Sequence, residues 1–326
     1  MCTAITYKTK DHYFGRNLDL EYSYNETVTI TPRNYVFKFR KMGEIQSHFA
    51  IIGMAYVVEN FPLYYDATNE KGLSVAGLNF PDNADYKPYS KGRDNITPFE
   101  LIPWILCQCV TVCDVKKLLG QINILNESFS DSLPLSPLHW IISDKERTIT
   151  LESVNSGIKI YDNPVGVLTN NPTFDYHIFN LNNYMSLTSG DIENTFSPRK
   201  DLALSTYSRG MGALGLPGDF SSMSRFVRAA FVKTNSVTCN ADNDSVSQFF
   251  HILKSVEMPR GCVKIGKECY AYTIYSSCCN TDRGVYYYTT YGNSGIRAID
   301  MHKENLNTDM LVCYSLKAAQ AIEYIN

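Results

Sequence analysis

The order of strand-like and helix-like segments constrains the fold of this chain most strongly. Strand-like runs open the sequence, a pair of helix-like segments follows, strands return near the middle, and a second helix-like pair precedes a strand-rich end. Strands and helices grouped in runs indicate stacked layers, whereas strict alternation of the two would indicate a parallel sheet. We therefore predict an α+β fold of four layers, αββα, in which two antiparallel sheets face each other between pairs of helices.

The expected elements can be placed along the chain from residue type and periodicity. Strands are expected over residues 2–9, 12–16, 27–32, 49–57, 73–79, 138–143, 148–154, 157–161, 166–169, 270–277, 284–291 and 295–301. Thr97, Pro98 and Glu100 predict a capping box with proline at the first helical position, and Pro103 should kink or shorten that helix. Helices are also expected from Thr111 to Gly120, over 222–233 and over 244–256.

Composition limits the classes of function. The 326 residues contain no repeat or long linker, so we expect one domain over 1–326. A net charge of −3 gives no basic surface for nucleic acid or an anionic membrane. The first residues lack the continuous apolar stretch of a secretion signal, and no apolar run is long enough to span a bilayer. We therefore expect a cytoplasmic protein whose ten cysteines are reduced.

Several of these cysteines lie close together in the sequence, which raises the alternative of a metal-binding module. Cys107, Cys109 and Cys113 form one group, and Cys278 and Cys279 another. No paired C-x-x-C spacing accompanies them, as structural zinc sites usually require. The first group also lies in an apolar helical stretch, where free cysteine packs as a small hydrophobic residue. We expect no metal and no other cofactor; a metal-binding module would instead contain stoichiometric zinc.

Cys2 directly follows Met1 and is the main candidate for catalysis. If Met1 is removed, one residue carries both a nucleophilic sulfur and a free α-amine that can act as its base. An unperturbed α-amine titrates near ~8 and a thiol near ~8.5, so both are within reach of neutral pH. With Met1 attached, Cys2 is a thiol without this base.

The first predicted hairpin brings charged residues towards Cys2. If Lys10 and Asp11 form a two-residue turn, paired residue numbers sum to about 21. Cys2 would then lie opposite Asp19, with Arg16 nearby, where the carboxylate could orient the amine and the guanidinium could favour the thiolate. The alternative is that Arg16 and Asp19 are ordinary surface residues near a strand end.

Several sequence blocks resemble the choloylglycine hydrolase family, N-terminal nucleophile amidases that comprise bile salt hydrolases and penicillin V acylases. The blocks cover nearly the whole chain, and the resemblance is greatest to the bile salt branch. They are MCTAITYKTKDHYFGRNLDLEYSYN, NEKGLSVAGLNFP, LHWIISD, GVLTNNPTFDYH, GLPGDFSSMSRFVRAAF, YTIYSSCCN and GVYYYTTYGN. The resemblance implies the four-layer fold of N-terminal nucleophile hydrolases, and it implies hydrolysis of an amide C–N bond.

The family's catalytic residues can be matched to this sequence position by position. The resemblance implies Cys2 as nucleophile, Arg16 as the group that stabilises its thiolate and Asp19 as the carboxylate that orients the amine. It also implies Asn79 and Asn170 as oxyanion donors and Arg225 as an electrostatic group. The first hairpin is shorter than in many relatives by an even number of residues, which preserves the faces of both strands.

The resemblance further implies the substrates, glycine- and taurine-conjugated bile acids, and a homotetramer. A steroid acyl group needs an apolar pocket with few polar anchors. By resemblance the loops around the site would supply Leu18, Tyr24, Val58, Tyr65, Leu133 and Leu138, each of which could equally be an ordinary core residue. The nearest rival is a penicillin V acylase, but Asn79 favours the bile salt branch because acylase relatives tend to carry an aromatic residue there. A catalytically silent protein that binds an amphipathic molecule would retain Met1 and release no product.

Overall fold

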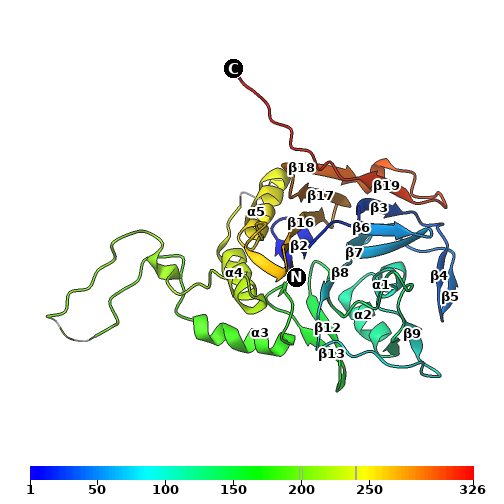
Figure 1. Ribbon diagram of the computed structural model, residues 1–326, viewed down its shortest axis with the longest axis horizontal. Coiled ribbons are helices and arrows are strands. Elements are labelled where there is room, and N and C mark those ends of the chain that lie inside the picture. The colour runs from blue at the N-terminus through cyan, green and yellow to red at the C-terminus, as the bar shows by residue number, and fades with distance from the viewer. Residues whose placement is uncertain (198, 200, 239–240) are drawn as a thin grey trace.

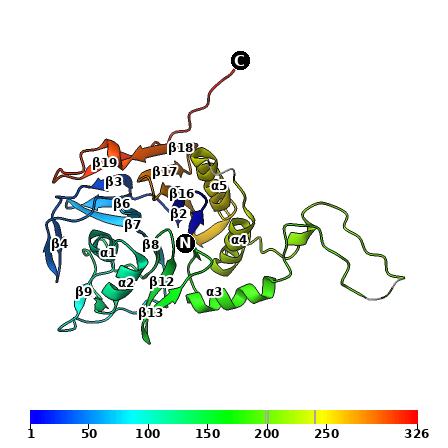
Figure 2. The same ribbon diagram turned by 180° about the vertical axis from the view of Figure 1, so that it is seen from behind.

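The computed structural model describes residues 1–197, 199, 201–238 and 241–326. Two large antiparallel sheets pack face to face, with helices on their outer faces (Figures 1 and 2). The predicted αββα layer order is therefore confirmed. The N-terminus lies near the centre of the molecule, whereas the C-terminal tail extends away from it (Figure 1).

The first sheet contains the N-terminal hairpin at its centre. Its strands, in spatial order, are β14 (Val167–Leu168), β1 (Cys2–Lys8), β2 (His12–Leu20), β16 (Cys269–Asn280), β17 (Val285–Thr290) and β18 (Asn293–Asp300), and β15 (Val263–Gly266) pairs with β16. β1 and β2 are buried along almost their whole length, because one face packs on the second sheet and the other on helices.

The second sheet contains most of the remaining strands. In spatial order they are β13 (Gly157–Asp162), β12 (Thr148–Val154), β11 (Leu138–Ser143), β8 (Ser74–Asn79), β7 (Phe61–Asn69), β6 (Ile51–Val58), β3 (Thr27–Thr31) and β19 (Val312–Ser315). Short pairs lie outside the two sheets: β4 (Phe37–Phe39) with β5 (Gly43–Ile45), and β9 (Asp94–Ile96) with β10 (Ile122–Ile124). The prediction missed β7, β19 and these short pairs.

The helices form the two outer layers. They are α1 (Leu101–Gln108), α2 (Val112–Leu119), α3 (Phe174–Asn180), α4 (Ser222–Asn235) and α5 (Asp242–Lys254), with the 3₁₀ turns η1 (Leu181–Tyr184), η2 (Met211–Ala213) and η3 (Met301–Lys303). α1 packs on β7 and β8 of the second sheet, and α4 and α5 pack on the first sheet. Among the described residues, no helix is both long and apolar enough to cross a membrane.

One predicted helix start is wrong. α1 begins only at Leu101, after Glu100 as N-cap, and Thr97 accepts no hydrogen bond from the first turn. Only half of the predicted box is present, because the Glu100 carboxylate accepts from Thr97 N at 3.0 Å and from the Thr97 hydroxyl at 2.8 Å. Pro103 then lies in the first turn of the helix, where a missing backbone N–H breaks no internal hydrogen bond. The second predicted start is confirmed, because Thr111 forms a capping box with α2.

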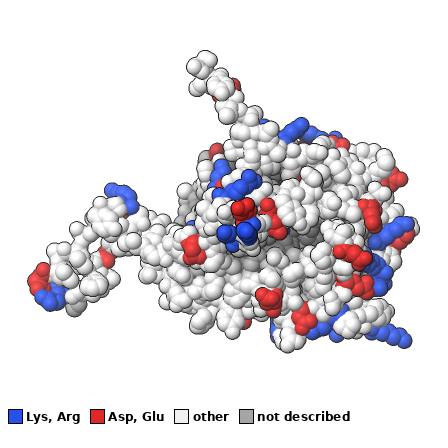
Figure 3. All heavy atoms as spheres, in the orientation of Figure 1, with Lys and Arg blue, Asp and Glu red and all other residues white. Residues whose placement is uncertain are grey.

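A long arm, which we define as the described residues between 185 and 220, leaves the body between η1 and α4 (Figure 1). Several large apolar side chains on it are exposed, among them Met185 at 80%, Phe196 at 82% and Tyr207 at 83%. Most of its surface in Figure 3 carries neither positive nor negative side chains. The arm therefore combines a projecting shape with several exposed apolar side chains.

Candidate active site

Cys2 opens β1 and is almost completely buried, with 2% of its surface exposed. Its neighbour across the hairpin is Leu18, not Asp19 as predicted. The turn has three residues, 9–11, in place of two, and this shifts the pairing by one position. The backbone of Asp19 pairs instead with Met1: its amide donates to the Met1 carbonyl at 2.9 Å.

This register gives the start of β1 two chemically distinct faces. Opposed residues of an antiparallel pair point to the same side of a sheet. The side chains of Cys2 and Arg16 therefore share one face, which we call the thiol face; it lies against the second sheet. Thr3 and Asp19 lie on the other, the amine face, towards α4 and α5. The predicted proximity of Arg16 to the sulfur is confirmed, and Asp19 lies on the face opposite to the sulfur.

Arg16 is fully buried on the thiol face. Its Nη1 donates to the carbonyl oxygens of Gly77 in β8 and, at 3.0 Å, Tyr65 in β7. Its Nη2 has no hydrogen-bond partner among the described residues. Burial acts to lower the pKa of Arg16, but the nearby Cys2, Tyr275 and Asp66 groups more than offset this and the pKa is raised. A permanent cation with an unused donor therefore lies beside the sulfur.

Arg225 occupies the corresponding place on the amine face. It projects from α4, and its guanidinium donates to the Cys2 carbonyl, to Thr3 Oγ1 at 2.6 Å, and to Asn170 Oδ1 at 2.8 Å. Its Nε donates to the Phe220 carbonyl at 3.0 Å. Burial lowers the pKa of Arg225, and the charges of Asp19 and Cys2 oppose that shift. The guanidinium stays charged and holds the first residues of β1 in place.

Asn170 connects this arginine to the backbone nitrogen of Cys2. Its Oδ1 accepts from Cys2 N at 2.9 Å as well as from Arg225, and two donors fix the orientation of the amide. Its Nδ2 donates to the Asn79 carbonyl at 2.6 Å, and its own carbonyl accepts from His177. The side-chain oxygen of Asn170 is thus occupied by Cys2 N and Arg225. One of its two amide hydrogens is bound to Asn79, and the other is left for an oxyanion.

Asp19 is fully buried, and its two carboxyl oxygens differ. Oδ1 accepts from Thr273 at 2.6 Å, whereas Oδ2 has no hydrogen-bond partner among the described residues. Burial raises the pKa of Asp19, while Arg225 and the N-terminal ammonium act in the opposite direction. A buried oxygen acceptor within the electrostatic range of the N-terminus is therefore available to a new donor.

The predicted substrate-binding residues are placed in different surroundings. Leu18 faces the same side as Cys2, whereas Leu138 pairs with Asn79 where β11 begins and β8 ends, and packs against the buried cluster around α1. Tyr65 carries one of the carbonyls that bind Arg16, and the ring of Tyr24 packs against those of Tyr22 and Tyr56. The remaining two lie on the periphery: Val58 ends β6, and Leu133 is in the loop before β11. Their contact with a substrate stays a prediction.

The structure adds buried polar groups that the sequence reasoning missed. Asp66 of β7 accepts from Tyr275 at 2.8 Å, Tyr286 at 2.6 Å and Ser277 at 3.1 Å, and it lies close enough to Arg16 to affect its pKa. Thr273 was missed in the same way as the partner of Asp19. No local pattern marks these residues, because their partners come from distant strands. His177 is a further buried polar residue, and its Nε2 bonds the Asn170 carbonyl at 2.9 Å.

Metal and disulfide chemistry can be examined only for the part of the chain that is described. There, no group of histidine, cysteine or acidic residues could hold a metal ion. The nine described cysteines are free thiols, and Cys107 and Cys109 pack in the core around α1 as predicted. Cys239 lies outside the described residues.

Comparisons with known proteins agree with this geometry. Residues 2–314 match the family of linear amide C–N hydrolases called the choloylglycine hydrolase family. The bile salt hydrolase/transferase of Lactiplantibacillus plantarum is 57% identical over 326 residues, which is 100% of both chains. A conjugated bile acid hydrolase from Clostridium perfringens has a structure with a TM-score of 0.92 at 38% identity, covering 100% of both chains. Penicillin V acylase from Agrobacterium tumefaciens shares the fold, with a TM-score of 0.76, 18% identity, and coverage of 98% of this chain and 94% of that one.

Proposed function

Because the chain belongs to the choloylglycine hydrolase family of linear amide C–N hydrolases, we propose that it is a bile salt hydrolase that cleaves glycine- and taurine-conjugated bile acids. One observation carries the proposal: two buried polar atoms on either side of Cys2 have no partner among the described residues, Arg16 Nη2 and Asp19 Oδ2. Unsatisfied buried polar atoms are costly, and they occur where a reacting group or ligand completes the site. Arg16 Nη2 suits a thiolate or an oxyanion, and Asp19 Oδ2 suits an ammonium.

In the proposed reaction, removal of Met1 frees the α-amine of Cys2. The amine takes the thiol proton, and Sγ attacks the amide carbon to form a tetrahedral oxyanion. Asn79 and the second amide hydrogen of Asn170 are the proposed side-chain donors to that oxyanion; one such donor is typically worth ~3–4 kcal/mol. Asp19 Oδ2 and Asn170 Oδ1 hold the ammonium that forms.

Collapse of the oxyanion breaks the C–N bond. The ammonium of Cys2 returns its proton to the departing nitrogen of glycine or taurine, which leaves as the free amine, and the acyl group stays on Sγ as a thioester. Water then attacks the thioester carbon and gives its proton to the α-amine. This releases the bile acid and regenerates the thiol. Each proton removed is returned, so no cofactor is required.

The proposed pocket for the acyl group lies on the thiol face. Leu18 shares that face with Cys2, and Tyr65 packs against the same cluster of buried residues, so both are proposed as walls of the pocket. Leu138 packs against the cluster on the α1 side of the second sheet, and it is proposed, like Tyr24, to contact the substrate from the rim of the pocket. Val58 and Leu133 are proposed to close the pocket from the loops. Apolar walls with few polar anchors match a steroid better than a small polar acyl group.

Cys2→Ser tests the nucleophile. The substitution keeps the amine and the hairpin but weakens the nucleophile, so release of glycine from glycocholate should fall by several orders of magnitude while bile salt binding persists. Mass spectrometry of the intact chain gives the matched control by confirming that Met1 is absent in both proteins. Wild-type turnover by the variant, or full activity with Met1 attached, would falsify the mechanism.

Substrate choice is tested by rates measured side by side on glycocholate, taurocholate and penicillin V. We expect the two bile salts to be hydrolysed far faster. A higher rate on penicillin V would assign the chain to the acylase branch instead, and no product from any of the three would favour a silent binding protein.

We also propose that the enzyme assembles as a homotetramer and that the arm contributes to subunit contacts. Its exposed Phe196 and Tyr207 support this, since large apolar side chains gathered on a projecting segment are typical of association surfaces. Phe196→Asp should lower the mass measured by analytical ultracentrifugation, whereas Tyr89→Asp, at an exposed site outside the arm, should not. An unchanged mass in Phe196→Asp would contradict the proposal that the arm contributes to subunit contacts.

A further inference from the structure

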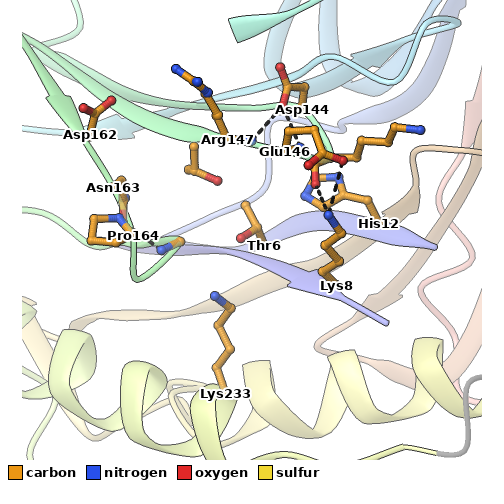
Figure 4. Close-up of a pocket in the computed structure, with 13 residues that line it drawn as sticks. Thr6, Lys8, His12, Asp144, Glu146, Arg147, Asp162, Asn163, Pro164 and Lys233 are labelled. Atoms are coloured by element: carbon orange, nitrogen blue, oxygen red, sulfur yellow. Dashed lines mark hydrogen bonds and ion pairs between the residues drawn. The ribbon is translucent and has the colours of Figure 1, made fainter. Parts of the chain in front are cut away.

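A polar pocket lies at the opposite end of β1 from Cys2 (Figure 4). Its volume is about 450 Å³, and it is lined by β1, the start of β2, the turn between β11 and β12, the end of β13 with the loop to β14, and α4. Cationic residues outnumber acidic ones in the lining, which includes Lys8, Lys145, Arg147 and Lys233. None of the proposed catalytic residues lines it.

Lys233 is the most unusual of these cations. Its side chain rises from α4 towards Thr6 and the open space of the pocket (Figure 4), and Nζ donates to the carbonyl of Val165. Gly166 makes room for the ammonium: a Cβ there would lie 2.8 Å from Nζ and 2.2 Å from Thr6 Oγ1. Burial lowers the pKa of Lys233 to about 8, as expected for an ammonium group taken out of water without a counter-ion.

Each acidic side chain in the lining is bound to another group. Asp144 accepts from backbone amides, including that of Val112 at 2.7 Å. Glu146 pairs with Lys8 at 3.4 Å, and Asp162 pairs with Lys116 at 2.6 Å. Among the described residues, Lys233 therefore has no carboxylate partner. Lys233 is half-buried, and an ammonium that is partly removed from water and bound by a single carbonyl would be completed by a ligand with negative charge.

We propose that this pocket is a second binding site, for a small oxyanion such as a carboxylate, sulfonate or phosphate, whose oxygen atoms are bound by the ammonium of Lys233. Arg147 also lines the pocket, but its side chain points away from Lys233 (Figure 4), so the ammonium of Lys233 is the proposed cationic contact of the ligand. The neutral donors of the lining, such as the hydroxyl of Thr6, can complete the coordination of a tetrahedral or planar anion.

The elements around this pocket are those that hold the active site. α4 carries Arg225 as well as Lys233, and β1 carries Cys2 as well as Thr6. The chain from Gly166 passes through β14 to Asn170. An anion bound by Lys233 therefore joins α4 to β1 and to the segment that leads to Asn170. Its binding should stabilise the folded enzyme.

Thermal unfolding of the full-length enzyme tests the site with inorganic phosphate as the probe, with sodium chloride at the same ionic strength as reference. At ten times its Kd, a bound ligand should raise the midpoint of unfolding by roughly 2 °C. Lys233→Met should remove the phosphate-dependent rise, and Lys233→Arg should retain it. Lys264→Met, which changes an exposed lysine of β15 outside the pocket, should behave as wild type.

Taurine and acetate, tested in parallel, distinguish a sulfonate or carboxylate ligand from a phosphate. No rise with any of the three probes, or an equal rise in Lys233→Met, would overturn the proposal, because the effect would then be absent or nonspecific. A second measurement needs no substitution: phosphate should protect Lys233, but not Lys264, from acetylation read by mass spectrometry. Equal acetylation of Lys233 with and without phosphate would also overturn it. Neither readout depends on hydrolysis, so the result is independent of the proposed function.

Discussion

The thiol face and the amine face of Cys2 each contain a fully buried arginine, but the two guanidinium groups are bonded differently. On the amine face, all three nitrogens of Arg225 donate to protein atoms. On the thiol face, Arg16 Nη2 has no hydrogen-bond partner among the described residues. Burial lowers the pKa of Arg225, whereas the pKa of Arg16 is raised because nearby anionic groups overcome its burial.

This difference separates a structural arginine from one that is available for chemistry. A buried charge whose donors are all satisfied fixes the groups around it and has little left to offer a substrate. A buried charge with an unused donor can still bind an anion that forms during the reaction. We therefore expect Arg225 to act mainly as a positioning residue and Arg16 mainly on the sulfur or the oxyanion.

The largest effect should come from Arg225→Met. Loss of the guanidinium leaves the Cys2 carbonyl, Thr3 and Asn170 without a shared donor, and it removes the cation that acts most strongly on Asp19. Breaking a buried charged network of this kind typically costs about 3–5 kcal/mol. Urea denaturation should show this loss in the free energy of unfolding. If the variant kept full stability but had reduced turnover, Arg225 would act directly on the substrate. The distinction drawn above between Arg225 and Arg16 would then be wrong.

Arg16→Met should instead change the reactivity of Cys2. An adjacent cation typically favours an anion by about 1–3 pK units, so the thiolate population should fall roughly tenfold or more. The rate at which iodoacetamide alkylates Cys2 at neutral pH measures this directly. Arg16→Lys is the matched control, because it keeps the charge and should keep most of the rate. Equal alkylation rates in wild type and Arg16→Met would show that Arg16 does not stabilise the thiolate of Cys2.

Acid should lower the free energy of unfolding through His177, whose imidazole bonds the Asn170 carbonyl at 2.9 Å beside the amine face. Burial lowers its pKa from 6.5 to about 4. As the pH falls below 6.5, the unfolded chain takes up the proton first, so stability is full above that pH and is lost between 6.5 and about 4. The loss for one such histidine is up to about 3 kcal/mol.

Denaturation at a series of pH values checks this expectation. His177→Gln keeps a donor for Asn170 but cannot titrate, so its free energy of unfolding should fall less steeply between these pH values. His12, whose pKa is also lowered to about 4 by burial, stays in the variant and contributes to the remaining slope, together with buried carboxyls such as Asp19 and Asp66 whose pKa values are raised by burial. Identical slopes in the two proteins would mean that His177 does not couple the amine face to pH.

The smallest effect is expected from Thr273→Val, which removes the hydroxyl that donates to Asp19 Oδ1 at 2.6 Å. A buried acceptor left without its donor typically costs about 1–2 kcal/mol. Denaturation should show that loss, and Thr273→Ser should show less because it keeps the hydroxyl. Turnover should also fall if Asp19 orients the amine. Unchanged turnover would mean that the hydrogen bond between Thr273 and Asp19 Oδ1 contributes to stability and not to catalysis.

The sequence predicted the layer order and most strands because period-two and helical patterns are local properties. It also predicted which residues gather at Cys2, through family blocks that surround Arg16, Asn170 and Arg225. It failed at the first hairpin, where one extra turn residue moved Asp19 across from Met1. Turn length depends on backbone conformations that Lys10 and Asp11 alone do not specify.

By itself, the sequence determined that a cysteine directly follows Met1 and that the chain carries the blocks of one hydrolase family. Only the tertiary structure decided which side of β1 each charged group occupies and which buried atoms are left unpaired. The same holds for Asp66, Thr273 and Lys233, whose partners or surroundings come from segments far away in the chain. The physical reason is that burial and hydrogen-bond satisfaction are properties of contacts between distant segments, and only the packed sheets and helices bring those segments together.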